Sequence, residues 1–195
     1  MTARLEWMAP LITLDLEEPS DFQPRSGVNR SVTRSDAGTT AAIVLETYDE
    51  VEVAFEAFSD ATWRNALWAW WSWARQGKVF GFALDNTKTS DTLVSSNAYS
   101  GDLTIAVADT FGFVAGDTIR LRSADRVDDE LVTVTSVGSG SLTVSEFRND
   151  YPAGSSVRHF GYYPSLYLPD DTYPFHDNPF LTWNLRFVAR EYVSP

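Results

Sequence analysis

The chain has 195 residues, no cysteine, and 15 Lys and Arg against 27 Asp and Glu, a formal net charge of −12. The absence of cysteine excludes disulfides, thiolate metal sites and cysteine nucleophiles. The excess of acids disfavours proteins that hold nucleic-acid phosphates or anionic lipid, whereas 44% hydrophobic residues suffice for a packed core.

The N-terminal third predicts strands and connecting segments. It has no basic stretch followed by a long apolar run, so we expect neither a signal peptide nor a membrane span. Residues 5–16 predict a strand broken near Pro10. Residues 17–27 hold two prolines and a glycine and are expected to form an extended loop or arm. Residues 39–58 predict two strands of a hairpin that turns at residues 48–50.

The second strand of that hairpin alternates apolar and acidic residues, the period of two that is typical of a half-buried strand. Val51, Val53 and Phe55 share one face. The other face carries Glu50, Glu52 and Glu56, for which an ordinary solvated surface is the simplest interpretation.

Residues 59–76 change to a helical period. We expect Ser59 to cap the helix and Gly77 to end it. One side is apolar and the other is polar, but Trp68 falls on the polar side. Either a second layer of the same subunit or a neighbouring subunit is expected to cover it. The candidate subunit-interface residues are Trp68, Arg64, Arg75 and Trp73.

The rest of the chain predicts an insert and a return to the first domain. Residues 89–159 contain short Thr- and Val-rich strands between glycine turns, a pattern typical of small SH3-like or OB-like barrels. Residues 161–179 are too rich in proline for regular structure, apart from a strand-like stretch at residues 166–168. Residues 181–189 alternate like a closing strand. We therefore expect a mainly β fold with one α-helix. It would be a β-sandwich domain formed by residues 1–88 and 160–195, with an inserted β-barrel module at residues 89–159.

The search for chemistry finds no enzyme signature. His159 and His176 are expected at the surface, and no GxSxG, HExxH, GxGxxG or phosphate-loop motif is present. We expect no enzyme, no cofactor and no metal site. The acids at residues 128–130 and 170–171 are expected to be solvated. The alternatives are a cation site or a cell-wall hydrolase whose acids, Asp128, Asp129, Asp170 and Asp171, converge.

The order of motifs around the helix is informative. An alternating strand pair precedes Trp-Arg-Asn-Ala-Leu-Trp-Ala-Trp-Trp at residues 63–71, and Gly77-Lys78 then leads into an apolar strand at residues 79–82. This order resembles the belt domains of bacteriophage tail proteins, and by organisation the distal tail proteins of siphophages. The insert, with Ala-Gly-Asp at residues 115–117 and Pro-Ala-Gly-Ser at residues 152–155, is similar to small β-modules of phage structural proteins.

The resemblance implies a tail-tube-like belt domain in a virion protein made in the host cytoplasm. Six copies would form a ring that joins the tail tube protein to hub or baseplate proteins, and DNA would pass through its lumen without specific binding. Strands of adjacent subunits would form a continuous inner β-barrel with the helix outside. Glu50, Glu52 and Glu56 are candidates to line that lumen, where carboxylates would repel DNA phosphates within about 8 Å. Tail tube and terminator roles stay open.

A second class of function is a carbohydrate- or receptor-binding module. Aromatic rings on loops of the insert and just after it would stack on sugars. The candidate ligand-contact aromatics are Tyr99, Phe111, Tyr151, Tyr162 and Tyr163.

Overall fold

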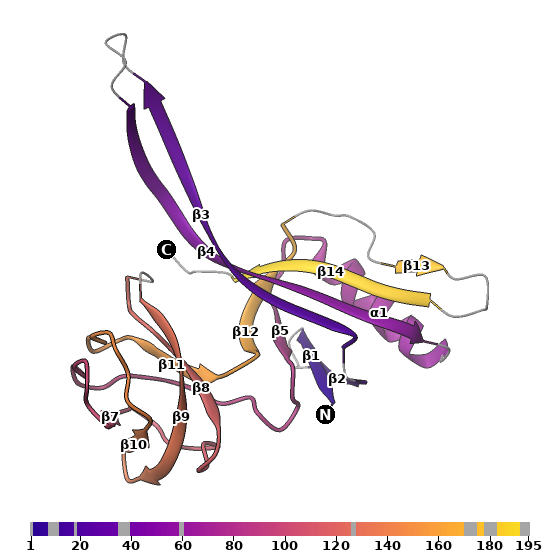
Figure 1. The fold of residues 1–195 in the computed structure, drawn as a ribbon. Helices are drawn as coiled ribbons and strands as arrows, with labels where there is room; N and C mark the ends of the chain where they lie inside the picture. The colour runs from indigo at the N-terminus through magenta and orange to yellow at the C-terminus, as the bar shows by residue number, and fades with distance from the viewer. Residues whose placement is uncertain are drawn as a thin grey trace. The chain divides into compact units, whose positions relative to one another are not determined.

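The computed structural model describes residues 2–7, 12–17, 19–34, 40–58, 61–125, 128–169, 175–177 and 183–191. The described chain is mainly β with one α-helix, which confirms the predicted fold class. It forms two compact units (Figure 1): unit 1 comprises Met1–Phe82 and Tyr163–Pro195, and unit 2 comprises Ala83–Tyr162. The predicted insert lies within the bounds of unit 2. Its folding as a separate barrel domain stays a prediction.

Unit 1 is built on a sheet of eight strands in the order β2-β1-β5-β12-β14-β4-β3, with β13 also paired to β14. Every pairing for which a register is defined in this sheet is antiparallel. The strands are β1 (Ala3–Trp7), β2 (Ile12–Leu16), β3 (Asp21–Arg34), β4 (Thr40–Phe58), β5 (Phe80–Ala83), β12 (Tyr162–Tyr167), β13 (Phe175–Asp177) and β14 (Trp183–Glu191).

The segment predicted as one broken strand consists of β1 and β2, which pair with each other from Ala3↔Leu16 to Trp7↔Ile12. Leu5 and Leu16 are fully buried, while Arg4 Nε lies 2.7 Å from Asp15 Oδ1 on the other face. The break predicted near Pro10 is therefore a reversal of the chain, and Pro10 itself lies outside the described residues.

Two predictions in the next segment were wrong. Residues 21–27 belong to β3 and do not form a loop, and residues 40–58 are one strand of 19 residues with no turn at 48–50. Pro24 is accommodated because β3 is the last strand of the sheet order, where a missing N–H need not break a ladder. Asp49 pairs with Ser26 and is buried, so the polar residues that suggested a turn lie inside the β3–β4 ladder.

The proline-rich segment after residue 161 departs from the prediction in part: β12 overlaps the strand-like stretch expected at residues 166–168 but begins earlier, and β13 was not predicted. Pro164 lies within β12. The paired residues of β12 and β14 are Leu166↔Glu191 and Tyr167↔Arg190, both after the proline. The closing strand is confirmed as β14, with Leu185, Phe187 and Ala189 buried.

The helix α1 (Ala61–Ala74) follows β4 and is confirmed together with its buried face. Leu67, Trp70 and Ala74 are fully buried, and the Trp70 ring lies 5.1 Å from the Phe80 ring and 5.0 Å from the Phe187 ring. Gly77 follows with φ +74°, the left-handed conformation expected just beyond a helix end. Ser59, the predicted cap, lies outside the described residues. Within the described chain, no helix is long and apolar enough to cross a membrane.

Unit 2 is a six-stranded antiparallel sheet in the order β6-β11-β8-β9-β10-β7. The two end strands are linked: Ser95 N–H donates to Ala106 O and Ala108 N–H to Leu93 O, each at 2.9 Å. The interior is aliphatic with Phe147 and Tyr151, both fully buried. The strands are β6 (Asp91–Leu93), β7 (Thr104–Ala106), β8 (Thr118–Arg122), β9 (Asp129–Gly138), β10 (Ser141–Val144) and β11 (Ser156–His159).

Candidate functional site

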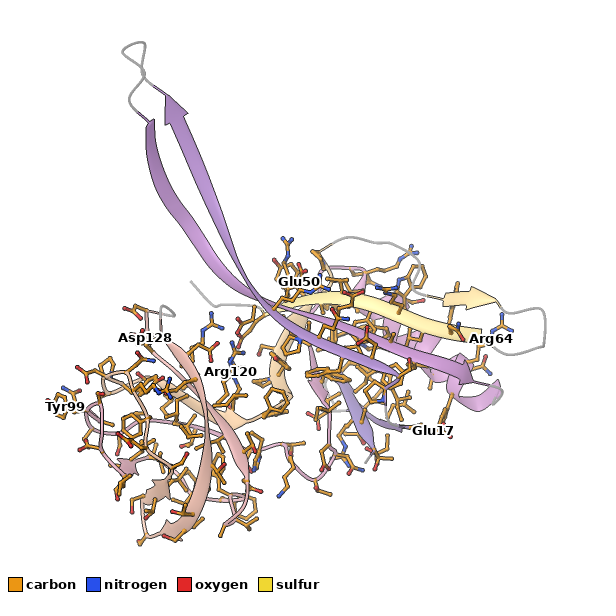
Figure 2. The ribbon with its side chains drawn as sticks, viewed as in Figure 1. Glu17, Glu50, Arg64, Tyr99, Arg120 and Asp128 are labelled. Atoms are coloured by element: carbon orange, nitrogen blue, oxygen red, sulfur yellow. The ribbon has the colours of Figure 1, made fainter. Side chains whose placement is uncertain are left out.

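Unit 1 presents a charged surface on the side of β3, β4 and β14 that faces away from its core. Alternation places Val53 and Phe187 in the core and polar residues on the opposite side. We call this surface the charged face, and it consists of Asp21, Gln23, Arg25, Glu50, Glu52, Arg186 and Arg190 (Glu50 is labelled in Figure 2).

Glu52 is the centre of the charged face. Its side chain is only 8% exposed and lies between two arginines from different strands. Arg25 Nη2 on β3 donates to Glu52 Oε2 at 2.9 Å, and Arg186 Nε on β14 donates to Glu52 Oε1 at 2.8 Å. The hydrogen bond to Glu52 raises the pKa of Arg186. This carboxylate therefore joins three strands.

The other charged groups of this face are also paired. Arg190 Nε lies 3.2 Å from Glu50 Oε2, and Gln23 bridges Asp21 and Arg25 through bonds of 2.8 and 2.6 Å. The three arginines thus contact two carboxylates, Glu50 and Glu52, and Asp21 brings the sum of the formal charges on this face to zero.

The expected acidic character of this surface is therefore corrected for Glu50 and Glu52, whose charges are balanced by arginines. The position of these residues in a lumen stays a prediction, and the side chain of Glu56 lies outside the described part of β4. The alternation of β14 places Arg186 and Arg190 on the side away from the core. It could not predict that Arg186 meets a glutamate 134 positions earlier.

Three of the four candidate interface residues lie on one stripe of α1 and the turn that follows it. Arg64, Trp68 and Arg75 align with Trp71, which the sequence did not suggest, at spacings of four, three and four residues. These four residues form the helix stripe. Arg64 and Arg75 are exposed and Trp68 is 50% exposed, as the helical period predicted. Trp73 lies off this stripe, half-buried, with Lys78 Nζ 5.7 Å from its ring centre.

No protein-family model matches this sequence, and no curated protein matches it.

The candidate ligand-contact aromatics divide into exposed and buried groups. Tyr99 is 58% and Phe111 84% exposed, and each backbone N–H is held at 2.9 Å by a neighbouring aspartate, Asp102 and Asp109. Tyr162 is half-buried. Tyr151 and Tyr163 are buried, so their prediction as ligand contacts is wrong: Tyr151 lies in the core of unit 2 and Tyr163 in that of unit 1.

Unit 2 also contains a buried charged group that the sequence did not suggest. His159, expected at the surface, is 1% exposed, and its Nε2 lies 2.9 Å from Asp117 Oδ2. Its Nδ1 accepts the Ser90 N–H at 3.1 Å, so the ring proton sits on Nε2 and is donated to Asp117. Lys88 Nζ and Val114 N–H also donate to this carboxylate. Because the histidine is closed off from solvent, the cluster stabilises the unit and is not placed to act on a substrate.

Two of the acids that offered a hydrolase or cation site, Asp129 and Glu130, bond to groups of unit 2. Glu130 accepts bonds from Tyr151 Oη at 2.9 Å and from the backbone N–H groups of Arg148 and Asn149. Asp129 pairs with Arg120. Asp170 and Asp171 lie outside the described residues. Within the described chain, no three His, Asp or Glu side chains gather as a metal site would require.

Proposed function

We propose that this protein is a structural subunit of a bacteriophage-type tail. Six copies form a ring at the distal end of the tail, join the tail tube to the hub or baseplate, and let DNA pass through the lumen. The motif order around α1 suggests the family, and one feature of unit 1 carries the argument for self-assembly.

That feature is the outer part of the β3–β4 hairpin, residues 26–34 and 40–49, which we call the ribbon. β4 pairs with β14 only from Glu50 onward, whereas its pairing with β3 continues to Thr40↔Arg34. In Figure 1 the ribbon runs on beyond the other strands of unit 1. Within the described chain, the two strands of the ribbon pair only with each other.

A two-stranded ribbon alone is marginally stable in water, because it has too little surface to bury. This ribbon also includes Val28, Val32 and a run of five apolar residues at 41–45. A neighbouring copy that covers the ribbon would stabilise it. A closed ring would also pair or cover the sheet edges that the single chain leaves at β2 and β3.

Shortening the ribbon is expected to abolish assembly and leave unit 1 folded. The variant replaces residues 28–47 with Asn-Gly, so that Gly27 and Tyr48, which already pair, flank a two-residue turn. Light scattering at several concentrations and two salt levels should give about six protomers for the wild-type protein, as the resemblance implies. The variant should be a monomer. Its far-ultraviolet circular dichroism spectrum should still be that of a folded, mainly β protein. A monomeric wild-type protein, with no rings in negative-stain electron microscopy, would contradict the proposal.

A second candidate function, carbohydrate binding by unit 2, is favoured by Tyr99 and Phe111. Both rings are exposed on loops whose backbone is fixed by aspartates, an arrangement that presents a flat apolar surface at low entropic cost.

If unit 2 binds glycans, changing both Tyr99 and Phe111 to Ala should reduce binding on a polysaccharide array by about tenfold or more without lowering the melting temperature. Leu103→Ala is the matched control, because Leu103 is also an exposed apolar residue, at 56%, but has no ring. Absence of binding by the wild-type protein across diverse polysaccharides would exclude this function.

A further inference from the structure

The segment formed by α1 and the four residues after it has a charge opposite to that of the protein as a whole. From Ala61 to Lys78 the sequence holds Arg64, Arg75 and Lys78 and no acid, in a chain whose net charge is −12. Arg64 lies on α1, Arg75 and Lys78 follow it, and all three are exposed. This segment therefore presents a local positive surface on an acidic protein.

Within this surface, Trp68 is held in a defined orientation. Its ring centre lies 5.2 Å from that of Trp71, which is only 5% exposed and carries the Arg75 guanidinium 4.8 Å above its ring. On the opposite side of α1, Trp70 is buried against Phe80 and Phe187. The Trp68 ring thus packs against the buried Trp71 ring. Its conformation is already restricted, so it loses little side-chain entropy on binding.

Tryptophan and arginine are the residues that most often dominate binding energy at protein interfaces. An exposed tryptophan between two arginines offers one apolar contact and two groups that bind carboxylates through paired hydrogen bonds. Such a stripe complements an acidic protein surface.

We propose that the helix stripe, Arg64, Trp68, Trp71 and Arg75, docks on a carboxylate-bearing surface of a second copy of this chain. The inference rests on the proposed ring and adds to it the surface through which neighbouring copies recognise each other. Each copy supplies the required chemistry, since it carries 27 Asp and Glu residues.

A protein surface fits this stripe better than a polyanion such as DNA. A polyanion binds through many phosphate contacts, and its approach to a protein of net charge −12 is unfavourable. Three cations on the helix and the segment that follows it are too few to offset that repulsion. They suffice for a contact with a few carboxylates, where an apolar ring excludes water.

The test compares four full-length variants by light scattering over a range of concentrations. Trp68→Ala and the double change Arg64→Glu with Arg75→Glu alter the stripe. Phe111→Ala and Arg148→Glu are the controls, since each changes an exposed residue of the same type in unit 2. Both stripe variants should weaken self-association by about tenfold or more, the controls should not, and all four should keep the wild-type melting temperature to within a few degrees.

The outcomes separate this inference from the proposed function. If wild type and stripe variants assemble equally well while shortening the ribbon abolishes assembly, the ring stands and the helix stripe is not its contact. If the wild-type protein is monomeric at every concentration, both proposals fail. If the stripe variants assemble normally but lose binding to a fluorescent DNA duplex, the stripe is a polyanion site and the inference is overturned.

Discussion

Replacing Trp70 by alanine is expected to lower the free energy of unfolding of unit 1 by about 3–5 kcal/mol, the usual cost of removing a large buried aromatic side chain. Trp70 is fully buried, and its ring contacts Phe80 on β5 and Phe187 on β14. Its removal would leave a cavity beside these two rings, and the cavity adds to the lost transfer free energy. Urea denaturation followed by circular dichroism measures the loss. Two transitions are to be fitted, because two compact units need not unfold together.

Trp68→Ala is the matched control, because it removes the same side chain from the same helix two residues earlier. Trp68 is 50% exposed, so the expected cost is below about 1 kcal/mol. Equal losses for the two variants would contradict the inward and outward faces of α1. A large loss for Trp70→Ala alone would also show that Trp68→Ala is suitable for testing assembly.

The face of this helix could be predicted because its period is a local property. Leu67, Trp70 and Ala74 recur at helical spacing, and the structure buries all three. The strands of unit 2 were predictable for a similar reason, since glycine turns bound short alternating runs. At Gly116 and Gly140 the chain has φ of +95° and +74°, values that few other residues adopt.

The extent of the β3–β4 hairpin and the charged face could not be predicted, since both depend on which strands pair and not on the local pattern. Pro24 looks like a strand breaker until β3 is known to be the last strand of the sheet. Asp49 looks like a turn residue until its pairing with Ser26 is known. Glu52 looks like a solvated acid until Arg25 and Arg186 are brought beside it. In each case the pairing of strands, and not the local pattern, decides the structure.

The second large effect is expected at Asp117, where the geometry requires a carboxylate. Three groups donate hydrogen bonds to it. They are Lys88 Nζ, His159 Nε2–H, whose nitrogen lies 2.9 Å from Oδ2, and the Val114 N–H, whose nitrogen lies 2.7 Å from Oδ2. Two carboxylate oxygens can accept all three bonds. An asparagine in this place has one acceptor oxygen and would turn an NH₂ group toward a donor. Asp117→Asn should therefore destabilise unit 2 by about 2–3 kcal/mol near neutral pH.

This effect should depend on pH in a defined direction. Burial raises the pKa of Asp117, but hydrogen bonds from Lys88, His159 and Val114 outweigh it and leave the pKa below its ordinary value. A carboxyl with a lower pKa in the folded state stabilises the protein above its unfolded-state pKa, about 4, and loses that contribution as the pH falls further. The difference in free energy of unfolding between wild type and Asp117→Asn should thus be constant near neutrality and shrink below about pH 4.

Urea denaturation at a series of pH values measures this difference, with Asp91→Asn as control because Asp91 is exposed on β6 of the same unit. The control should stay close to the wild type at every pH. A difference for Asp117→Asn that persists unchanged into acid would mean that the carboxylate charge is not what stabilises the cluster. Convergence of the two free energies in acid would instead show that the charge of the buried Asp117 carboxylate holds the Lys88 and His159 segments together.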